Sequence, residues 1–433
     1  MTSIFVRSPG LSAMRGRRTS GGSGREFGGR LLRGALLIAA LTVTLVGCGA
    51  ERQSAVPSNL TEQASVLGIP NARFWPDTQG AALAEEALQA LARERAATPG
   101  AAAGRQLPPA NFLAISGGSD DGAFGAGLLV GWSAAGTRPQ FKLVTGVSTG
   151  SLIAPFAFLG PTYDPQLRAI YTGIGPDDIF EKRNLFAVVL DDSLADTSPL
   201  FKLISRYADA NMLAAVANEY KKGRLLLIGT TDLDAQRPVL WNMGAIAASG
   251  KPEALQLFRK ILLASAAVPG LFPPVLFNVE AGGRSHQELH VDGGAVALTF
   301  LYPPQIGSMI DLKQASLARE RHAYIIRNGR LDPDWASVDP RVLKIVGRAI
   351  SAMIHYSGYN DILRIYNTTR QDGVDYNLAF IGPEFNFPHK EDFDTAYMRA
   401  LFDYGYKRAV TGYPWRKAPP IFEKPTEPKV SSR

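Results

Sequence analysis

The sequence contains few residues that bind metals or form disulfide bonds. It contains one cysteine, Cys48, among 433 residues, which excludes an intrachain disulfide and any metal cluster made of several cysteines. The Gly-Lys-Ser/Thr triplet of a phosphate-binding loop is also absent,. Histidine is scarce, and none of the five histidines has a local setting that marks it as a catalytic base: His286, His290, His322, His355 and His389. We therefore expect no metal and no cofactor.

Long apolar runs are missing as well. The uncharged run Gly34 to Gly47 is far too short to cross a bilayer as a permanent helix,. It follows an Arg-, Gly- and Ser-rich stretch, a layout typical of a signal peptide covering residues 1–47. Seven arginines and one glutamate give this segment +6 of the formal net charge of +7. The remainder has no basic stripe with interleaved aromatics, so we expect no nucleic-acid partner.

The apolar run ends at the single cysteine. Leu45-Val46-Gly47-Cys48 resembles the bacterial lipobox, in which the cysteine receives diacylglycerol and becomes the first residue of the mature protein. The resemblance implies a membrane anchor at Cys48. Because Gly49 stands where an aspartate would resemble an inner-membrane retention signal, we expect the periplasmic face of the outer membrane. An ordinary signal peptide is the alternative, and Met14 is an alternative start to Met1.

The remaining chain is predicted to be an α/β domain with two appendages. Residues 48–108 read as a tether with one amphipathic helix at 81–97, residues 109–385 as the main domain, and residues 386–433 as a C-terminal helix with a loose tail. Strand, turn and helix patterns follow one another twice, at 112–135 and 143–159, and helical and apolar strand patterns alternate afterwards. This alternation favours a mainly parallel sheet with helical crossovers.

The sharpest local signal is Leu143 to Leu152. Apolar, β-favouring residues lead into Gly146-Val147-Ser148-Thr149-Gly150, and an apolar helical pattern follows,. The flanking Gly146 and Gly150 allow a strained turn from which the hydroxyl of Ser148 projects. Ser148 is therefore a candidate nucleophile, with a structural Gly/Ser turn as the competing interpretation.

A second turn, Ser116 to Gly122, lies between a predicted strand and a helix. Its successive backbone N–H groups form a nest for negative charge,. A dinucleotide site fits poorly, because Ser119 replaces the middle glycine and Asp120 and Asp121 would repel a pyrophosphate. An oxyanion hole made by N–H groups of Gly117, Gly118 and Ser119 fits better, because a nucleophile elbow follows. We expect the two aspartates to be solvated or to cap the next helix rather than to bind a metal.

An aspartate turn supplies a candidate base. Asp292-Gly293-Gly294 follows an apolar approach, as expected of an aspartate at a strand end, although a plain Asp-Gly turn reads the same,. Order along the chain also allows an α/β-hydrolase triad of Ser148, Asp292 and a later histidine: His322, His355 or His389. The residues alone leave both arrangements open.

Together these pieces resemble the patatin-like phospholipase family. The glycine turn, the Ser148 elbow and the Asp292-Gly293-Gly294 turn come in the family's order, and 264–274 resembles its Ala-Ser-x-Ala-x-Pro-x-x-Phe-Pro stretch. The resemblance implies a three-layer α/β sandwich and a Ser148–Asp292 dyad without histidine. Ser119 and Asp121 stand where the family has a glycine and a basic residue. The backbone N–H groups survive a Gly-to-Ser change if position 119 needs no positive φ.

The function that the resemblance implies is hydrolysis of a lipid acyl ester through an acyl-serine, of the phospholipase A or lysophospholipase type. The expected partners are this lipid or other acyl-ester substrate and the membrane that holds the anchor. Acyl transfer to an acceptor other than water would use the same residues. An inactive lipid-binding lipoprotein is the alternative of another class. The sequence does not indicate the head group, the chain length, the position of cleavage or the oligomeric state.

Overall fold

The computed structural model describes residues 52–101, 105–179, 181–182, 195–309, 319–333 and 335–422. The predicted signal peptide, Cys48 and the end of the predicted tail lie outside the described residues. From Gln53 onward the chain forms one compact unit. Within the described part, no helix is both long and apolar enough to cross a bilayer.

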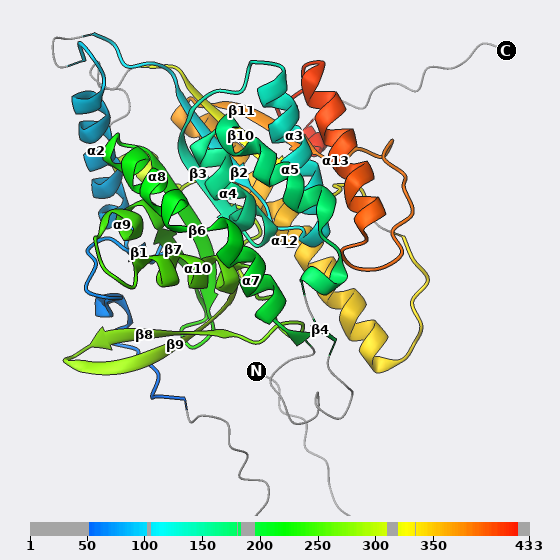
Figure 1. Cartoon of the computed structure of the whole chain (residues 1–433), viewed down its shortest axis with the longest axis horizontal. Helices are drawn as coiled ribbons and strands as arrows, with labels where there is room; N and C mark the ends of the chain where they lie inside the picture. The colour runs from blue at the N-terminus through cyan, green and yellow to red at the C-terminus, as the bar shows by residue number, and fades with distance from the viewer. Residues whose placement is uncertain are drawn as a thin grey trace, which may run out of the picture. The chain divides into compact units, whose positions relative to one another are not determined.

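Five parallel strands form the centre of the main sheet, in the order β6-β3-β2-β10-β11 (Figure 1). Their bounds are β2 Ala110–Ile115, β3 Phe141–Val147, β6 Leu225–Asp232, β10 Arg321–Arg327 and β11 Asp375–Phe380. Antiparallel strands extend it beyond β6: β7 Arg237–Asn242, β1 Arg73–Phe74 and the hairpin of β8 Val275–Ala281 with β9 Arg284–Asp292. The sheet is thus mixed with a parallel core, as predicted. A separate two-stranded sheet joins β4 Glu181–Lys182 to β5 Ala195–Asp196.

Helices cover both faces of the sheet, which makes three layers. One layer contains α3 Gly122–Ala134, α4 Thr149–Leu159, α5 Asp164–Gly173, α7 Ser198–Tyr207, α8 Ala210–Lys221, α9 Met243–Ala248, α10 Ala254–Ser265 and α13 Thr395–Val410. The other contains α2 Gly80–Ala97, α11 Ile306–Met309 and α12 Val342–Asp372. Short 3₁₀ turns lie at Thr61–Gln63, Ser119–Asp121, Pro161–Tyr163, Pro176–Asp178, Gly293–Ala295 and Pro420–Phe422.

The alternation of side chains along the strands builds the two cores. On β6, Leu226 and Ile228 join the core under the larger helical layer, whereas Leu225 and Leu227 join the core under α2. Residues on both faces of a central strand are therefore apolar, which explains its continuous apolar run. The predicted fold class, a mainly parallel α/β sandwich, is confirmed.

The C-terminal helix belongs to the domain, so the predicted division at residue 386 does not hold. Helix α13 packs closely on α3, side by side in Figure 1. A Cβ on Gly127 would lie 2.0 Å from the carbonyl oxygen of Phe402, and one on Gly131 would lie 2.4 Å from that of Tyr406. Only glycine permits this approach of the two backbones, so the small residues of α3 are explained by α13.

The predicted tether is wrong for residues 53–75. This segment packs onto the domain: β1 pairs with β7, Ser65 bridges to Glu280, and Trp75 is buried. Its apolar residues enter the core from loops and are therefore irregularly spaced. A segment without helix or strand periodicity resembles a linker in the sequence, which explains the difference. Strand β7 forms an antiparallel hairpin with β6.

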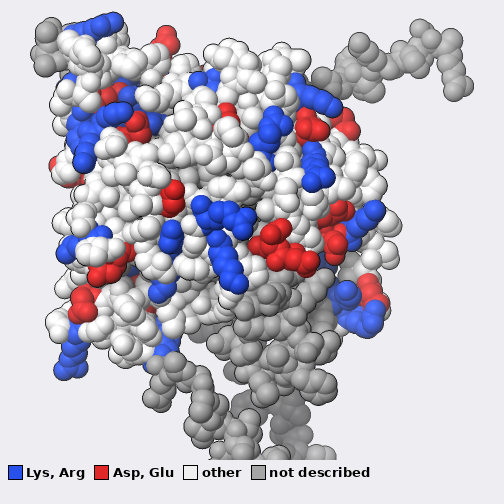
Figure 2. Space-filling model, viewed as in Figure 1, with Lys and Arg blue, Asp and Glu red and all other residues white. Residues whose placement is uncertain are grey.

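Charged side chains do not gather by sign on the face shown in Figure 2. Lysine and arginine are interspersed there with aspartate and glutamate. This distribution agrees with the small net charge of the chain after residue 47. It offers no basic stripe on that face for a nucleic-acid backbone.

Candidate active site

The turn around Ser148 is a strained link between β3 and α4. Ser148 has φ 55° and ψ −129°, a conformation that side-chain-bearing residues rarely adopt,. A Cβ on Gly146 would lie 2.4 Å from the carbonyl oxygen of Gly150, and one on Gly150 would lie 2.3 Å from that of Ile115. The two glycines therefore let the turn close tightly, at the start of a helix whose first N–H groups favour negative charge.

Ser265 supports this turn from behind. Its hydroxyl accepts a hydrogen bond from the backbone N–H of Ser148 at 3.1 Å and donates one to the carbonyl of Gly229 at 2.7 Å. The hydroxyl of Ser151 donates to the carbonyl of Ser148 at 2.6 Å. The 264–274 stretch, which carried part of the family resemblance, thus has a structural role at the elbow.

Asp292 ends β9, where it pairs in register with Thr230 of β6. Its Oδ1 accepts a hydrogen bond from the N–H of Gly294 at 2.7 Å, whereas its buried Oδ2 has no hydrogen-bond partner among the described residues. Burial raises the pKa of Asp292 to about 7, although the nearby Ser148 hydroxyl and the Gly294 N–H act to lower it. The structure therefore brings Ser148 and Asp292 together, with one carboxylate oxygen free to take a proton.

The glycine turn lies next to Ser148, but its donors differ from the predicted set. The N–H of Gly117 is taken, because it donates to the carbonyl of Leu298 at 2.9 Å. Among the described residues, the N–H groups of Gly118 and Ser119 have no hydrogen-bond acceptor. A Cβ on Gly117 would lie 3.0 Å from that of Ser148. Gly118 and Ser119 thus remain as candidate oxyanion donors.

Ser119 does adopt a positive φ, 54°, so the condition set for a harmless Gly-to-Ser change is not met. The left-handed conformation costs a non-glycine residue about 1–2 kcal/mol. The surrounding structure therefore holds Ser119 in this unfavourable backbone conformation. At Gly118 no side chain is possible, since a Cβ would lie 2.0 Å from the carbonyl oxygen of Asn328.

The two aspartates of the turn bind the C-terminal segment. Asp120 accepts hydrogen bonds from Nε2 of His389 at 2.8 Å and from the N–H of Phe393 at 2.9 Å. Asp121 accepts one from the hydroxyl of Tyr397 at 2.6 Å. Burial raises the pKa of Asp121 to about 6, against the lowering effect of Tyr397. The prediction that these carboxylates are solvated or cap the next helix is therefore wrong: Asp120 is buried, and Asp121, which precedes α3, makes no capping hydrogen bond.

A buried arginine under the turn was not visible in the sequence. Arg327, at the end of β10, donates to the carbonyl of Gly117 at 3.2 Å and is 5 % exposed. Burial lowers its pKa to about 10, while Asp121 and Asp361 act to raise it. Arg327 therefore provides the positive charge that position 121 lacks. Only the pairing of β10 with β2 brings it there.

No histidine, and all five lie in the described part of the chain, forms a hydrogen bond with Ser148 or Asp292. His322 pairs with Asp375, His389 with Asp120, and His290 with Thr230 and Glu288. The geometry gives no support to the triad alternative.

Asp232, Glu288 and His290 are close enough together to suggest a metal site. Glu288, however, is already paired with the buried Arg73, whose NH2 group donates to it at 2.9 Å. Burial acts to raise the pKa of Glu288, but Arg73 and His290 outweigh it and hold this pKa at about 2. An internal ion pair accounts for the cluster without a metal.

Residues 113–301 match the model of one known family, described as patatin-like phospholipase. This region of the chain is a patatin-like phospholipase domain. Among solved structures, VipD from Legionella pneumophila matches 71% of this chain and 67% of its own at 11% identity, with a TM-score of 0.29, too low to carry an argument. No curated protein matches the chain. The family assignment supports a lipid acyl hydrolase in the broad sense.

The patatin-like domain contains the glycine turn, Ser148 and Asp292, but the match ends before several residues that hold the site. Arg327 ends β10 and Asn328 follows it, whereas His389 precedes α13 and Tyr397 lies in its first turn. The region matched by the family model is therefore completed by the last third of the chain.

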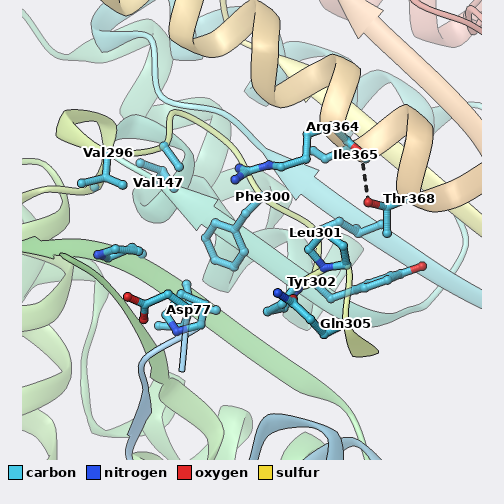
Figure 3. Close-up of a pocket in the computed structure, with 18 of the residues that line it drawn as sticks. Asp77, Val147, Val296, Phe300, Leu301, Tyr302, Gln305, Arg364, Ile365 and Thr368 are labelled. Carbon is cyan, nitrogen blue, oxygen red and sulfur yellow. Dashed lines mark hydrogen bonds between the residues drawn. The ribbon is translucent and has the colours of Figure 1, made fainter. Parts of the chain in front are cut away.

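A mainly apolar cavity of about 230 Å³ lies beside the segments that carry Ser148 and Asp292. Figure 3 shows Phe300 at its centre, Val147 and Val296 on one side, and Arg364, Ile365 and Thr368 of α12 on the other. Ser148 and Asp292 do not line it, but their chain neighbours Val147 and Gly293 do. Ser148 is 7 % and Asp292 4 % exposed, so both candidate residues are covered in this structure.

Proposed function

We propose that the protein hydrolyses lipid acyl esters with Ser148 as nucleophile and Asp292 as general base. The observation that carries this proposal is the buried Asp292 at the nucleophile elbow, with Oδ2 unpartnered and a pKa raised to about 7. A carboxylate with this pKa is a much better base at neutral pH than an ordinary aspartate. No other group is needed to accept the proton of Ser148.

The reaction has two steps. Ser148 Oγ forms a bond to the ester carbonyl carbon while its proton passes to Asp292, and the carbonyl oxygen becomes an oxyanion near the N–H groups of Gly118 and Ser119. The ester bond then breaks, and the departing alcohol takes the proton from Asp292. Water attacks the acyl-serine, Asp292 again accepts and returns a proton, and the fatty acid leaves.

The apolar cavity supports a lipid substrate over a small polar ester. Its lining is mostly apolar, with Phe300 at the centre, and it borders the residues next to Ser148 and Asp292. We assign it to the acyl chain. The positive charge of Arg327 is buried under the turn, so it acts on the turn and does not reach a head group.

The test is hydrolysis of p-nitrophenyl acyl esters, together with labelling by a fluorophosphonate. Ser148→Ala is expected to lose both, and Asp292→Asn to lose turnover, while circular dichroism shows an intact fold. Full activity of Ser148→Ala would overturn the assignment. An active Asp292→Asn together with a dead histidine variant would favour the triad. A folded wild type that neither reacts nor hydrolyses would favour the inactive lipid-binding lipoprotein.

We further propose that Cys48 carries a lipid anchor and that the protein resides at the periplasmic face of the outer membrane. The support is the sequence alone: a signal-peptide layout, the lipobox-like Leu45 to Cys48 and the absence of an aspartate at position 49. Two acyl groups at one terminus suffice for stable anchoring.

A further inference from the structure

The N-terminal half of α12 has an unusual exposure. From Val342 to Ile354 the helix leaves the sheet, and in Figure 1 its yellow end extends beyond the neighbouring elements. Large apolar side chains are exposed along it, Val342 at 73 % and Met353 at 71 %, and the others are Ile345, Val346, Ile350 and Ile354. Trp335, in the segment before the helix, is 88 % exposed.

These side chains are sorted by helical geometry. At about 100° per residue, Val342, Ile345, Val346, Ile350 and Met353 fall on one side of the helix. The basic residues Lys344, Arg348 and His355 fall on the opposite side, and Arg341 precedes the helix. Asp339 pairs with Arg341 at 2.6 Å. No aspartate or glutamate occurs from Arg341 to Asn360.

Such a helix needs an apolar partner. An isolated helix as short as the segment Val342–Ile354 is only marginally stable in water. Most helices in proteins gain their stability by burying an apolar face. Here the apolar face is turned to solvent, and contiguous exposed apolar surface marks an interaction site. A basic polar side opposite a wide apolar side, with a tryptophan nearby, is the composition of a helix that lies in the interface of an anionic bilayer.

The other half of the same helix reaches the active site. Asp361 accepts hydrogen bonds from the N–H groups of Leu298 at 2.7 Å and Thr299 at 3.1 Å. Leu298 in turn accepts the Gly117 N–H. Arg364, Ile365 and Thr368 line the cavity shown in Figure 3. A surface bound at the start of α12 is thereby linked, through one rigid helix, to the cavity assigned to the acyl chain.

We propose that Val342–Tyr356 of α12, together with Trp335, is the surface by which the domain lies on an anionic phospholipid bilayer. The choice of a lipid surface as occupant rests on the proposed function, because an acyl-ester hydrolase must reach lipid at a membrane. The basic side then faces lipid phosphates, and the apolar side is buried among the acyl chains.

The test uses full-length protein carrying Cys48→Ser, so that no lipid anchor contributes, and Ser148→Ala, so that binding is measured without turnover. Co-sedimentation is compared for vesicles of phosphatidylglycerol and of phosphatidylcholine. We expect binding to phosphatidylglycerol, a loss of more than about tenfold for Ile350→Glu/Met353→Glu, and a loss of about fivefold per charge for Lys344→Gln/Arg348→Gln. Val410→Glu, at the 41 % exposed end of α13, is the matched control.

Two further readouts separate this proposal from the proposed function. With Ser148 restored, Ile350→Glu/Met353→Glu should keep hydrolysis of a soluble p-nitrophenyl ester and lose that of vesicle phospholipid. If the protein with Ser148 restored binds vesicles but has no esterase activity, the membrane-binding surface is supported and the proposed hydrolase function is refuted. A blue shift of tryptophan emission on phosphatidylglycerol vesicles should disappear in Trp335→Phe.

The proposal is overturned if the double glutamate variant binds vesicles as the parent does. It is also overturned if light scattering shows a dimer in the parent and a monomer in that variant with equal vesicle binding, because the apolar face is then an interface between two copies. Equal binding to both vesicle types would refute the role of the basic side.

Discussion

The hydroxyl of Ser265 bridges the backbone N–H of Ser148 and the carbonyl of Gly229. Ser265 ends α10, so a helix 117 residues away in sequence fixes the strained φ of the nucleophile turn. Strain of this kind persists only when the surroundings hold it in place. The single hydroxyl that satisfies two buried groups is therefore a positioning group for Ser148.

Ser265→Ala should lower kcat by roughly tenfold to a hundredfold, since misplacement of a nucleophile by a fraction of an ångström has effects of this size. It leaves the Ser148 N–H without its partner, which costs about 1–3 kcal/mol of stability. Steady-state kinetics on a soluble ester and urea denaturation measure both effects. Ser249→Ala, which removes a hydroxyl bonded to the Ile246 carbonyl at 2.7 Å, is the control. An unchanged kcat for Ser265→Ala would show that the turn at Ser148 keeps its conformation without the Ser265 hydroxyl.

The activity should follow the ionisation of Asp292. Burial raises the pKa of Asp292 to about 7, and in the proposed mechanism only its carboxylate form accepts the Ser148 proton,. On a soluble ester, kcat/KM should therefore rise with pH up to about 7 and level off above it. Asp121, with a pKa of about 6, titrates nearby, so Asp121→Asn serves as the control and should keep the inflection. A flat profile between pH 5 and 8 would contradict the role of Asp292.

The same shift has a consequence for stability. Because the folded pKa of Asp292 lies above the ordinary value of 3.8, the folded protein holds a proton that the unfolded chain has released between about pH 4 and 7,. The stabilising effect of this proton is present below pH 4 and is lost as pH rises through 7. Asp292→Asn has no such dependence, so its thermal midpoint should exceed that of the wild type more at pH 8 than at pH 5.

Sequence patterns predicted the local part of this molecule well. The turns at Ser148 and Asp292, the parallel core and most helices follow from short-range periodicity and from glycines beside a serine or an aspartate. Contacts between residues that are distant in the sequence could not be predicted. Arg327 lies 210 residues from Gly117, and Tyr397 lies 276 residues from Asp121, so no local pattern connects them.

Two errors have the same physical cause. Residues 53–75 looked like a tether because their apolar side chains enter the core singly, without the period of a helix or strand,. Gly117 was counted as an oxyanion donor because its N–H follows a strand, and the acceptor on Leu298 is 181 residues away. Periodicity in the sequence indicates which side chains of a helix or strand are buried. It does not indicate which distant loop will accept a hydrogen bond from a given backbone N–H group.

The hydrogen bond from Tyr397 to Asp121 should hold the glycine turn on α13. Tyr397→Phe leaves the buried carboxylate without this donor, which should cost about 1.5–3 kcal/mol, raise the pKa of Asp121 and reduce kcat,. Tyr406→Phe is a matched control on the same helix, because among the described residues the hydroxyl of Tyr406 has no hydrogen-bond partner. Its loss should cost less than about 0.5 kcal/mol. Equal effects of the two variants on kcat would show that Asp121 does not position the turn.

The proposed lipid anchor at Cys48 should decide whether the protein stays with membranes through a carbonate wash. Cys48→Ser is expected to move it to the washed-off fraction, because contact through α12 alone is peripheral. Fractionation of whole cells with antibody detection measures this, and outer-membrane marker proteins test the location. Carbonate-resistant Cys48→Ser protein would require an anchor other than this thiol.

Substitutions at Gly118 and Ser119 distinguish the effect of backbone conformation on catalysis from the effect of side-chain chemistry. Ser119→Gly removes the strain of a positive φ at 54° and keeps the N–H donor. It should stabilise the fold by up to about 1 kcal/mol and change kcat by less than about twofold. Gly118→Ala places a Cβ 2.0 Å from the Asn328 carbonyl oxygen and should lower kcat by about a hundredfold or more, because the turn must open,.

Gly160→Ala controls for backbone strain alone. Gly160 has φ +93°, and a Cβ there has nothing within 4 Å. This variant should lose stability but not kcat. A dead Ser119→Gly enzyme would mean that the Ser119 hydroxyl itself acts on the substrate, and the two N–H groups would no longer suffice as the oxyanion hole. An active Gly118→Ala enzyme would remove the turn from the mechanism, since its N–H groups cannot keep their places around an added methyl group.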